Sequence, residues 1–157
     1  MFPKYHFLLG FVFSLILFIF CPKIDFLAAI IIFLSSFLID IDHYLFLILN
    51  KGPKNIFKAY FLGIKMKKKG YQTTKEKRKK IKTGFYIFHG IEFLVILVIL
   101  GYLVHDIFYF ILMGCFFHLV LDAIETFAKG YRKLKFSSIY DYFLFKKSNK
   151  TLKNNLS

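Results

Sequence analysis

The sequence predicts an all-α integral membrane protein with four transmembrane helices and amphipathic segments at the membrane interface. Of its 157 residues, 57% are hydrophobic and the mean hydropathy is +0.57, more apolar surface than a soluble domain of this length could cover. Four apolar stretches, at residues 6–21, 26–49, 85–104 and 107–128, have about the length that crosses a bilayer. Basic residues gather between and after them, with 13 of the 23 Lys and Arg in residues 51–82 and eight in 129–153.

The first two stretches are joined by a tight turn at residues 22–25. Residues 6–21 are expected to be retained as a helix and not removed as a signal peptide, because Ile19 and Phe20 are too bulky for a cleavage site. Residues 26–49 are long enough to cross with some tilt. The last two stretches are joined by a minimal turn at His105 and Asp106, and Gly101 and Gly114 are positions where helices can approach closely.

The loop at residues 50–84 and the tail at 129–157 are predicted to lie at the membrane surface. Residues 54–66 place five apolar side chains on one helical face, the pattern of an interfacial amphipathic helix, and residues 67–82 are predicted to be a solvated, mobile linker. The tail is basic and aromatic and is a second interfacial candidate; its last ten residues are predicted to be disordered. The five apolar residues are Ile56, Phe57, Tyr60, Phe61 and Ile64.

The distribution of charge predicts a multi-pass protein of the cell membrane with both termini in the cytoplasm. Cytoplasmic loops carry an excess of Lys and Arg, which places the loop and tail inside, and Lys4 places the N-terminus there as well. Residues 1–128 then form one transmembrane domain that includes the loop, followed by the tail. Membrane lipids with anionic headgroups are the expected partners, and no direct nucleic-acid partner is expected, because topology explains the positive charge. The oligomeric state, including a homo-oligomer, is left open.

Carboxylates and imidazoles interrupt all four stretches, with few basic residues near them. A charge near the bilayer centre costs about 2.5–3.5 kcal/mol, so five unpaired carboxylates would cost on the order of 10 kcal/mol. A bound metal ion would offset this cost. At about 1.5 Å of rise per residue, most of these groups fall roughly 6–15 Å inside the cytoplasmic ends of their helices, and His6 opens the first stretch on the same side, so that all share one slab. They are His6, Asp40, Asp42, His43, His89, Glu92, His118, Asp122 and Glu125.

Nitrogen and oxygen donors together favour Zn²⁺, Mn²⁺ or Fe²⁺, and the number of candidates allows one ion or two. On a regular helix Asp42 projects about 200° from Asp40, so one of the two is expected to orient a histidine unless the backbone breaks between them. Glu92, Glu125 and Asp42 are the candidates for a general base. The predicted metal ligands are His6, Asp40, Asp42, His43, His89, His118 and Asp122.

Each of these residues also has a simpler explanation when it is taken alone. His6 and His105 lie where interfacial polar residues are common. Asp40 and Asp42 could pair with lysines of the following loop by snorkelling, and Glu92 could be a packed polar contact. The metal hypothesis depends on the convergence of these groups at one depth.

At these residues the chain resembles the YdjM-like family of predicted membrane-bound, metal-dependent hydrolases, described as LexA-binding proteins of the inner membrane. The resemblance rests on an early histidine (His6), an Asp-x-Asp-His block at residues 40–43, a mid-chain histidine (His89) and a His-x-x-x-Asp pair at residues 118–122. The family often continues from its mid-chain histidine to an Arg and a second histidine, whereas this chain has Glu92 there. The resemblance implies a divalent metal and a hydrolytic reaction without naming a substrate.

The sequence therefore predicts a membrane-embedded, metal-dependent hydrolase of an ester or phosphoester, with a lipid-like substrate at the cytoplasmic leaflet. One alternative is a proton- or metal-coupled transport subunit, because chains of intramembrane acids and histidines also mark ion pathways. Against it, the polar groups occupy only the inner half of the membrane. Another alternative is a non-catalytic adaptor whose basic loop recruits a partner.

Overall fold

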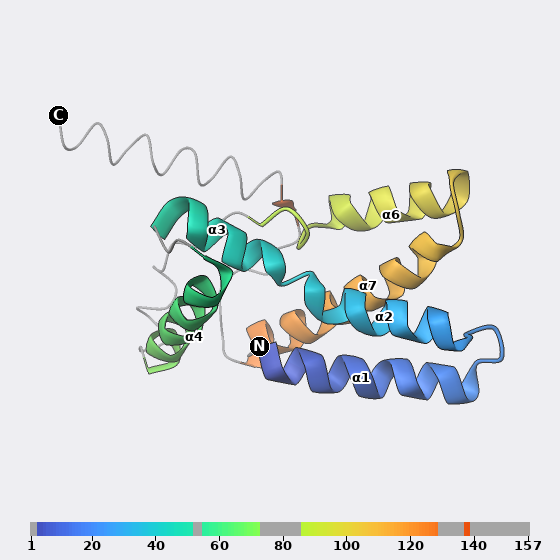
Figure 1. Ribbon diagram of the computed structural model, residues 1–157, viewed down its shortest axis with the longest axis horizontal. Coiled ribbons are helices and arrows are strands. Elements are labelled where there is room, and N and C mark those ends of the chain that lie inside the picture. The colour runs from blue at the N-terminus through green and yellow to red at the C-terminus, as the bar shows by residue number, and fades with distance from the viewer. Residues whose placement is uncertain (1–2, 52–54, 73–85, 129–136, 139–157) are drawn as a thin grey trace. The chain divides into compact units, whose positions relative to one another are not determined.

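Figure 1 shows a computed structural model that describes residues 3–51, 55–72, 86–128 and 137–138. All regular structure in these ranges is helical, which confirms the all-α fold class. The chain divides into two compact units, residues 1–41 with 93–134 and residues 42–92 with 135–157, and each is described by itself. Three stretches, Pro3–Phe20, Phe26–Leu49 and Ile107–Ala128, are long and apolar enough to cross a membrane. Apart from Ser137 and Ser138, the predicted tail lies outside the described residues.

Three helices form the body of the first unit: α1 (Pro3–Phe20), α2 (Phe26–Leu38) and α7 (Ile107–Ala128). Helix α2 packs extensively against both α1 and α7. The predicted turn precedes it, and Oδ1 of Asp25 accepts a hydrogen bond from the backbone N–H of Ala28 at 2.7 Å, the usual way to begin a helix. A small apolar core of Ile24, Ala28 and Ile32 lies where α1 and α7 meet α2.

The buried positions of these helices carry small or polar side chains, while large apolar ones face outward. Phe11 is 49% exposed and Ile19 63% exposed, although both belong to a helix whose buried residues include a histidine and a serine. Helix bundles in membranes have this inverted distribution, because lipid accepts large apolar side chains and small residues let helix backbones approach. The buried residues are His6, Gly10 and Ser14 on α1, and Gly114, Cys115 and His118 on α7.

Two glycines allow close contact with α2, Gly114 of α7 with its backbone and Gly10 of α1 with the side chain of Ser36. A Cβ added at Gly114 would lie 2.0 Å from Oγ of Ser35 and 2.3 Å from the carbonyl oxygen of Ile32. A Cβ added at Gly10 would lie 2.0 Å from Oγ of Ser36. The close approach predicted at Gly114 is therefore confirmed, and Gly10, which the sequence analysis did not single out, contributes equally.

The second predicted stretch is not one regular helix. Helix α2 ends at Leu38, residues 39–40 form a turn, and α3 (Ile41–Lys51) follows. The backbone N–H of Asp40 bonds the carbonyl of Phe37 at 3.3 Å, and the carbonyl of Ser36 is taken instead by the side chain of His118. A side chain that enters the backbone ladder is a known cause of a helix break. The single stretch predicted at residues 26–49 is thus corrected to two helices, and the turn between them contains Asp40.

The second unit contains most of α3 together with α4 (Ile56–Gln72). The helix predicted at residues 54–66 is present but runs further, which corrects the linker expected from residue 67; residues 73–82 of that linker lie outside the described ranges. Lysine is a good helix former, so a run of lysines does not end a helix.

The third predicted stretch is corrected at its start. Helix α6 (Ile91–Leu103) begins six residues later than expected, and residues 86–90 before it are not helical. At 13 residues it is about 20 Å long, shorter than a usual membrane span. Four crossings therefore remain a prediction. The fourth predicted stretch coincides with α7.

Candidate metal centre

His6 lies on the buried face of α1, and it is 1% exposed. His6, Gly10 and Ser14 recur every four residues and so share one helix face, and Gly10 lets that face approach α2. Both ring nitrogens of His6 are buried, and neither has a hydrogen-bond partner in the part of the chain that the structure describes. Leaving a buried polar group unsatisfied costs about 1–3 kcal/mol, so this imidazole is a candidate ligand for a bound ion.

His118, on α7, is fully buried and held by the backbone of α2. Its Nδ1 lies 2.7 Å from the carbonyl oxygen of Ser36. A carbonyl can only accept a hydrogen bond, so Nδ1 carries the proton and the lone pair of the neutral ring is on Nε2. A second hydrogen bond of this kind is how proteins fix the tautomer of a histidine that binds a metal through its other nitrogen.

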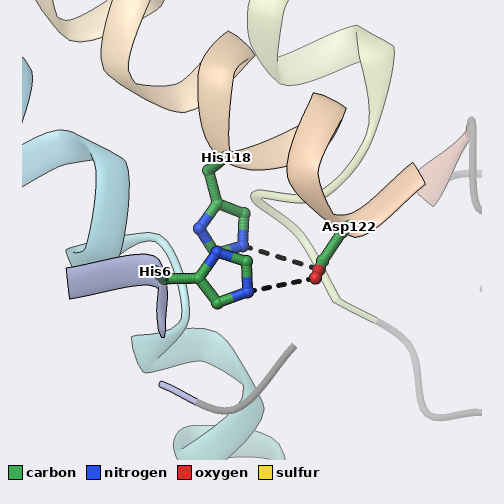
Figure 2. Close-up of side chains that lie close together, drawn as sticks. All are labelled: His6, His118 and Asp122. Carbon is green, nitrogen blue, oxygen red and sulfur yellow. Dashed lines mark ion pairs between the residues drawn. The ribbon is translucent and has the colours of Figure 1, made fainter. Parts of the chain in front are cut away.

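The lone pair of His118 faces two carboxylates. Nε2 lies 3.6 Å from Oδ1 of Asp40, at the turn after α2, and 3.6 Å from Oδ2 of Asp122, one helical turn further along α7. The other oxygen of Asp122 lies 3.1 Å from Nε2 of His6, without the alignment of a hydrogen bond. As Figure 2 shows, the two imidazole rings stack, with centroids 4.0 Å apart, and both turn toward Asp122. We call His6, Asp40, His118 and Asp122 the His6–His118 site.

The spacing of these atoms fits a metal ion. Donors bound at about 2.0–2.2 Å in a tetrahedral arrangement lie about 3.3–3.6 Å from one another. The three separations in the site run from 3.1 to 3.6 Å, and His6, His118 and Asp122 can each offer one atom within 4.8 Å of the others. Two imidazoles and two carboxylates are a donor set for Zn²⁺, Mn²⁺ or Fe²⁺. A cation here would also remove the repulsion between the lone pairs that face one another.

The site is closed on most sides and opens at one residue. The side chains of His6, His118 and Asp40 are 1%, 0% and 9% exposed, whereas that of Asp122 is 28% exposed. Glu125 lies three residues beyond Asp122, on the same side of α7, and is half-buried. Asp122 is therefore the most exposed member of the site.

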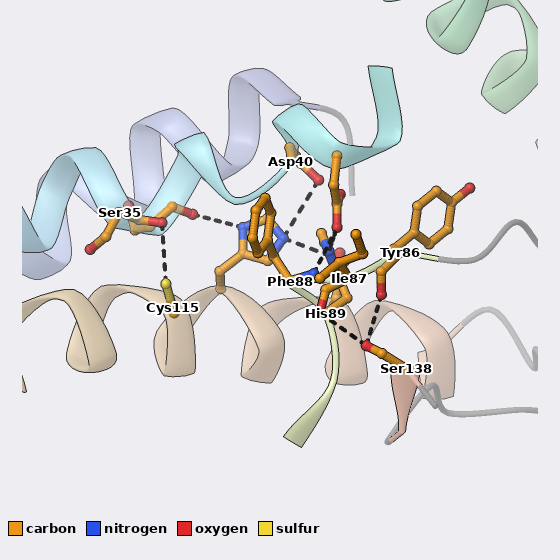
Figure 3. Close-up of polar contacts among 12 residues, drawn as sticks. Ser35, Asp40, Tyr86, Ile87, Phe88, His89, Cys115 and Ser138 are labelled. Carbon is orange, nitrogen blue, oxygen red and sulfur yellow. Dashed lines mark hydrogen bonds and ion pairs between the residues drawn. The ribbon is translucent and has the colours of Figure 1, made fainter. Parts of the chain in front are cut away.

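A second group of predicted residues lies in the second unit. Oδ2 of Asp42 accepts hydrogen bonds from the backbone N–H of Phe88 at 3.0 Å and from Nδ1 of His89 at 3.1 Å (Figure 3). The ring of His43 lies 4.4 Å from that of His89. The carboxylate of Asp42 thus fixes the orientation of the His89 ring through Nδ1. That role for Asp42 stays a prediction, as do those of His43 and His89.

The segment that carries His89 is held by two serines from beyond α7. Oγ of Ser138 donates to the carbonyl oxygens of Tyr86 at 2.8 Å and Ile87 at 3.1 Å (Figure 3). Glu92 accepts hydrogen bonds from Oγ of Ser137 and, at 3.0 Å, from the backbone N–H of Ser138. Because His89 precedes α6 and Glu92 lies in its first turn, the two residues do not share a helix face. Glu92 has a structural task here, and its role as a general base stays a prediction.

The structure also shows residues that the sequence analysis missed. Ser36 orients His118 through its backbone carbonyl, a role with no signal in the sequence. The spacing of His6, Gly10 and Ser14 could have revealed the inward face of α1. His105, at the turn before α7, is exposed and accepts a hydrogen bond from the backbone N–H of Ile107 at 3.1 Å, in keeping with its expected place outside the site.

No protein-family model matches the chain, and neither does any curated protein or solved structure. The resemblance to the YdjM-like hydrolases therefore rests on the sequence motifs alone.

Proposed function

We propose that this chain is a membrane-embedded, metal-dependent hydrolase that acts on an ester or phosphoester of a lipid-like substrate at the cytoplasmic leaflet. The observation that carries the proposal is the fixed tautomer of His118, whose Nε2 faces Asp40 and Asp122 at 3.6 Å each. A divalent ion between these groups would be bound by the imidazole nitrogen and would neutralise the charge of the two carboxylates. The motifs shared with the YdjM-like family support the hydrolytic reaction.

The membrane setting supports a lipid-like substrate. Three stretches are long and apolar enough to cross, and large apolar side chains face outward along α1 and α7. In the proposed topology both termini and the basic loop are cytoplasmic, and α6 with its flanking residues makes the fourth crossing. The His6–His118 site then lies a few turns inside the cytoplasmic surface, where the polar head of a lipid can reach it.

Each residue of the site has a proposed task. His6, Asp40, His118 and Asp122 hold the ion, while Ser36 keeps His118 in its binding tautomer. A divalent ion supplies a Lewis acid that lowers the pKa of a bound water and polarises the ester or phosphoryl oxygen. Asp122 is the partly exposed member of the site, and Glu125, three residues further along α7, would accept the proton of the attacking water. The buried ring of His6 would help to exclude solvent from the ion.

The first test is the metal content of the full-length chain and of two near-isosteric variants, His118→Gln and Asp122→Asn. We expect the wild type to contain Zn, Mn or Fe, and each variant to bind it at least about 100-fold more weakly, because each loses a charged or nitrogen donor. Elemental mass spectrometry of the purified protein measures this. His105→Gln and Asp106→Asn are matched controls at the exposed turn before α7 and should keep the metal.

The second test is a hydrolysis panel of phospholipids and prenyl phosphates with the metal-loaded protein. Activity that disappears in His118→Gln and persists in His105→Gln supports the proposal. Equal metal content in the wild type and both site variants contradicts it. Metal binding without hydrolysis of any ester, together with ion flux in proteoliposomes, would favour a transport subunit instead.

A further inference from the structure

Helix α4 carries an exposed face that the metal proposal does not use. The opposite side of α4 packs on α3: Ala59 is fully buried, and a Cβ added at Gly63 would meet Leu47 at 3.4 Å. On the outward side, Phe57 is 73% exposed and Phe61 69% exposed. Two adjacent phenylalanines at such exposure are costly in water, so a partner is expected to cover them.

Two lysines continue the same face toward the end of the helix. Positions 57, 61, 65 and 68 recur every three or four residues and form one stripe, and Lys65 and Lys68 are both exposed. Helix α4 contains five lysines and no acidic residue. The stripe therefore changes from aromatic to basic along the helix axis, over about 16 Å between its first and last positions.

An open depression of about 560 Å³ lies on this stripe, where its aromatic and basic halves meet. Because it is open, it suits a headgroup at a membrane surface better than an enclosed ligand. Apolar side chains line one part of it and ammonium groups the other, so it suits an amphiphile with an anionic head. The lining residues are Phe61, Ile64, Lys65, Lys68 and Lys69.

We propose that this face of α4 binds the phosphate headgroups of anionic phospholipids, with Phe57 and Phe61 at the acyl boundary and Lys65 and Lys68 at the phosphates. Interfacial helices bury their apolar face about 5–10 Å deep, and each nearby lysine adds to the attraction for anionic lipid. A bilayer is favoured over a nucleic acid because the same chain has three stretches that are long and apolar enough to cross a membrane, and because aromatic and basic residues are separated along the axis. The inference does not depend on the metal proposal.

The experiment counts lipids bound to the full-length protein in non-ionic detergent, by native mass spectrometry, after addition of phosphatidylglycerol or phosphatidylcholine. Wild-type protein is expected to retain phosphatidylglycerol in preference, and salt should weaken this binding. The double variant Lys65→Gln, Lys68→Gln should lose about tenfold or more of that affinity. The matched control Lys4→Gln, Lys23→Gln removes the same charge elsewhere and should retain it.

A separate variant tests the aromatic half of the stripe. Phe61→Ser should weaken phosphatidylglycerol binding several-fold while leaving its salt dependence intact. Equal retention of the two lipids by the wild type overturns the proposal, and so does an equal loss in both double variants. Displacement of phosphatidylglycerol by inorganic phosphate alone, or tighter binding of an oligonucleotide than of lipid, also overturns it.

Discussion

Gly114→Ala should dismantle the His6–His118 site without removing any of its ligands. The added Cβ would lie 2.0 Å from Oγ of Ser35, which can rotate away, and 2.3 Å from the carbonyl oxygen of Ile32, which cannot. Because the interface is closely packed and has no empty space for the new methyl group, α7 must move about 1 Å away from α2. His118 follows Gly114 by one helical turn, and the same shift would stretch its 2.7 Å contact with Ser36 beyond hydrogen-bonding distance.

Gly114→Ala should lower both the stability of the protein and its affinity for metal. Overpacking of this kind costs about 1–3 kcal/mol of stability. Loss of the group that orients a metal-bound histidine lowers metal affinity by about 10–100-fold. Both should appear together in Gly114→Ala, because one displacement causes both.

Metal titration of the apo-protein and thermal unfolding, followed by tyrosine fluorescence, measure the two effects. Gly63→Ala is the matched control: its Cβ would meet Leu47 at 3.4 Å, an ordinary contact, so both quantities should stay near wild-type values. If Gly114→Ala bound metal as tightly as the wild type and unfolded at the same temperature, the close packing of α7 on α2 would not be what positions His118.

Three further substitutions probe other contacts. Asp42→Asn keeps the shape of the side chain but weakens its hydrogen bond with Nδ1 of His89. The affinity of any metal bound by His89 should then fall about tenfold or more. A metal titration curve identical to that of the wild type would show that Asp42 does not orient a metal ligand. Ser138→Ala removes the hydroxyl that donates to two carbonyls of the segment before α6, a loss of about 1 kcal/mol in stability. Amide hydrogen exchange in residues 86–89 should therefore accelerate. Exchange at the wild-type rate would show that Ser138 does not hold this segment. Asp25→Ala removes the N-cap of α2 and should lower stability by about 1 kcal/mol, whereas Asp25→Asn, which can still accept the hydrogen bond, should restore most of it in thermal unfolding.

The helical fold could be predicted because composition and hydropathy act locally. Residues 107–128 form a helix with the predicted bounds, since a continuous apolar run between polar turns leaves little alternative. The start of α6 could not be predicted, because the apolar and aromatic residues at 85–88 look like a continuation of the hydrophobic run of the helix. What keeps residues 86–89 out of the helix are contacts with Asp42 and Ser138, each more than 40 residues away in the chain.

The residues of the candidate site could be predicted from the sequence, but their arrangement could be predicted only in part. The break between α2 and α3 was not predicted, although the angular conflict between Asp40 and Asp42 left room for one. Its cause is a histidine 82 residues away that takes the carbonyl of Ser36, and no local pattern encodes such a contact. His6 has a simpler explanation when taken alone, and only the packing at Gly10 and Gly114 shows why it points inward. Whether His43 and His89 belong with the His6–His118 site stays a prediction.

The two cysteines of this chain differ in exposure, which makes the thiols natural reporters. Cys21, at the end of α1, is half-exposed, whereas Cys115 is 3% exposed against α2, three residues before His118. A thiol reagent such as a maleimide reacts only with a cysteine that it can reach. It should therefore alkylate Cys21 quickly in the folded chain, and Cys115 only when α7 separates from α2. The rate at which Cys115 is alkylated would then measure how often α7 separates from α2 beside the His6–His118 site, without any engineered label.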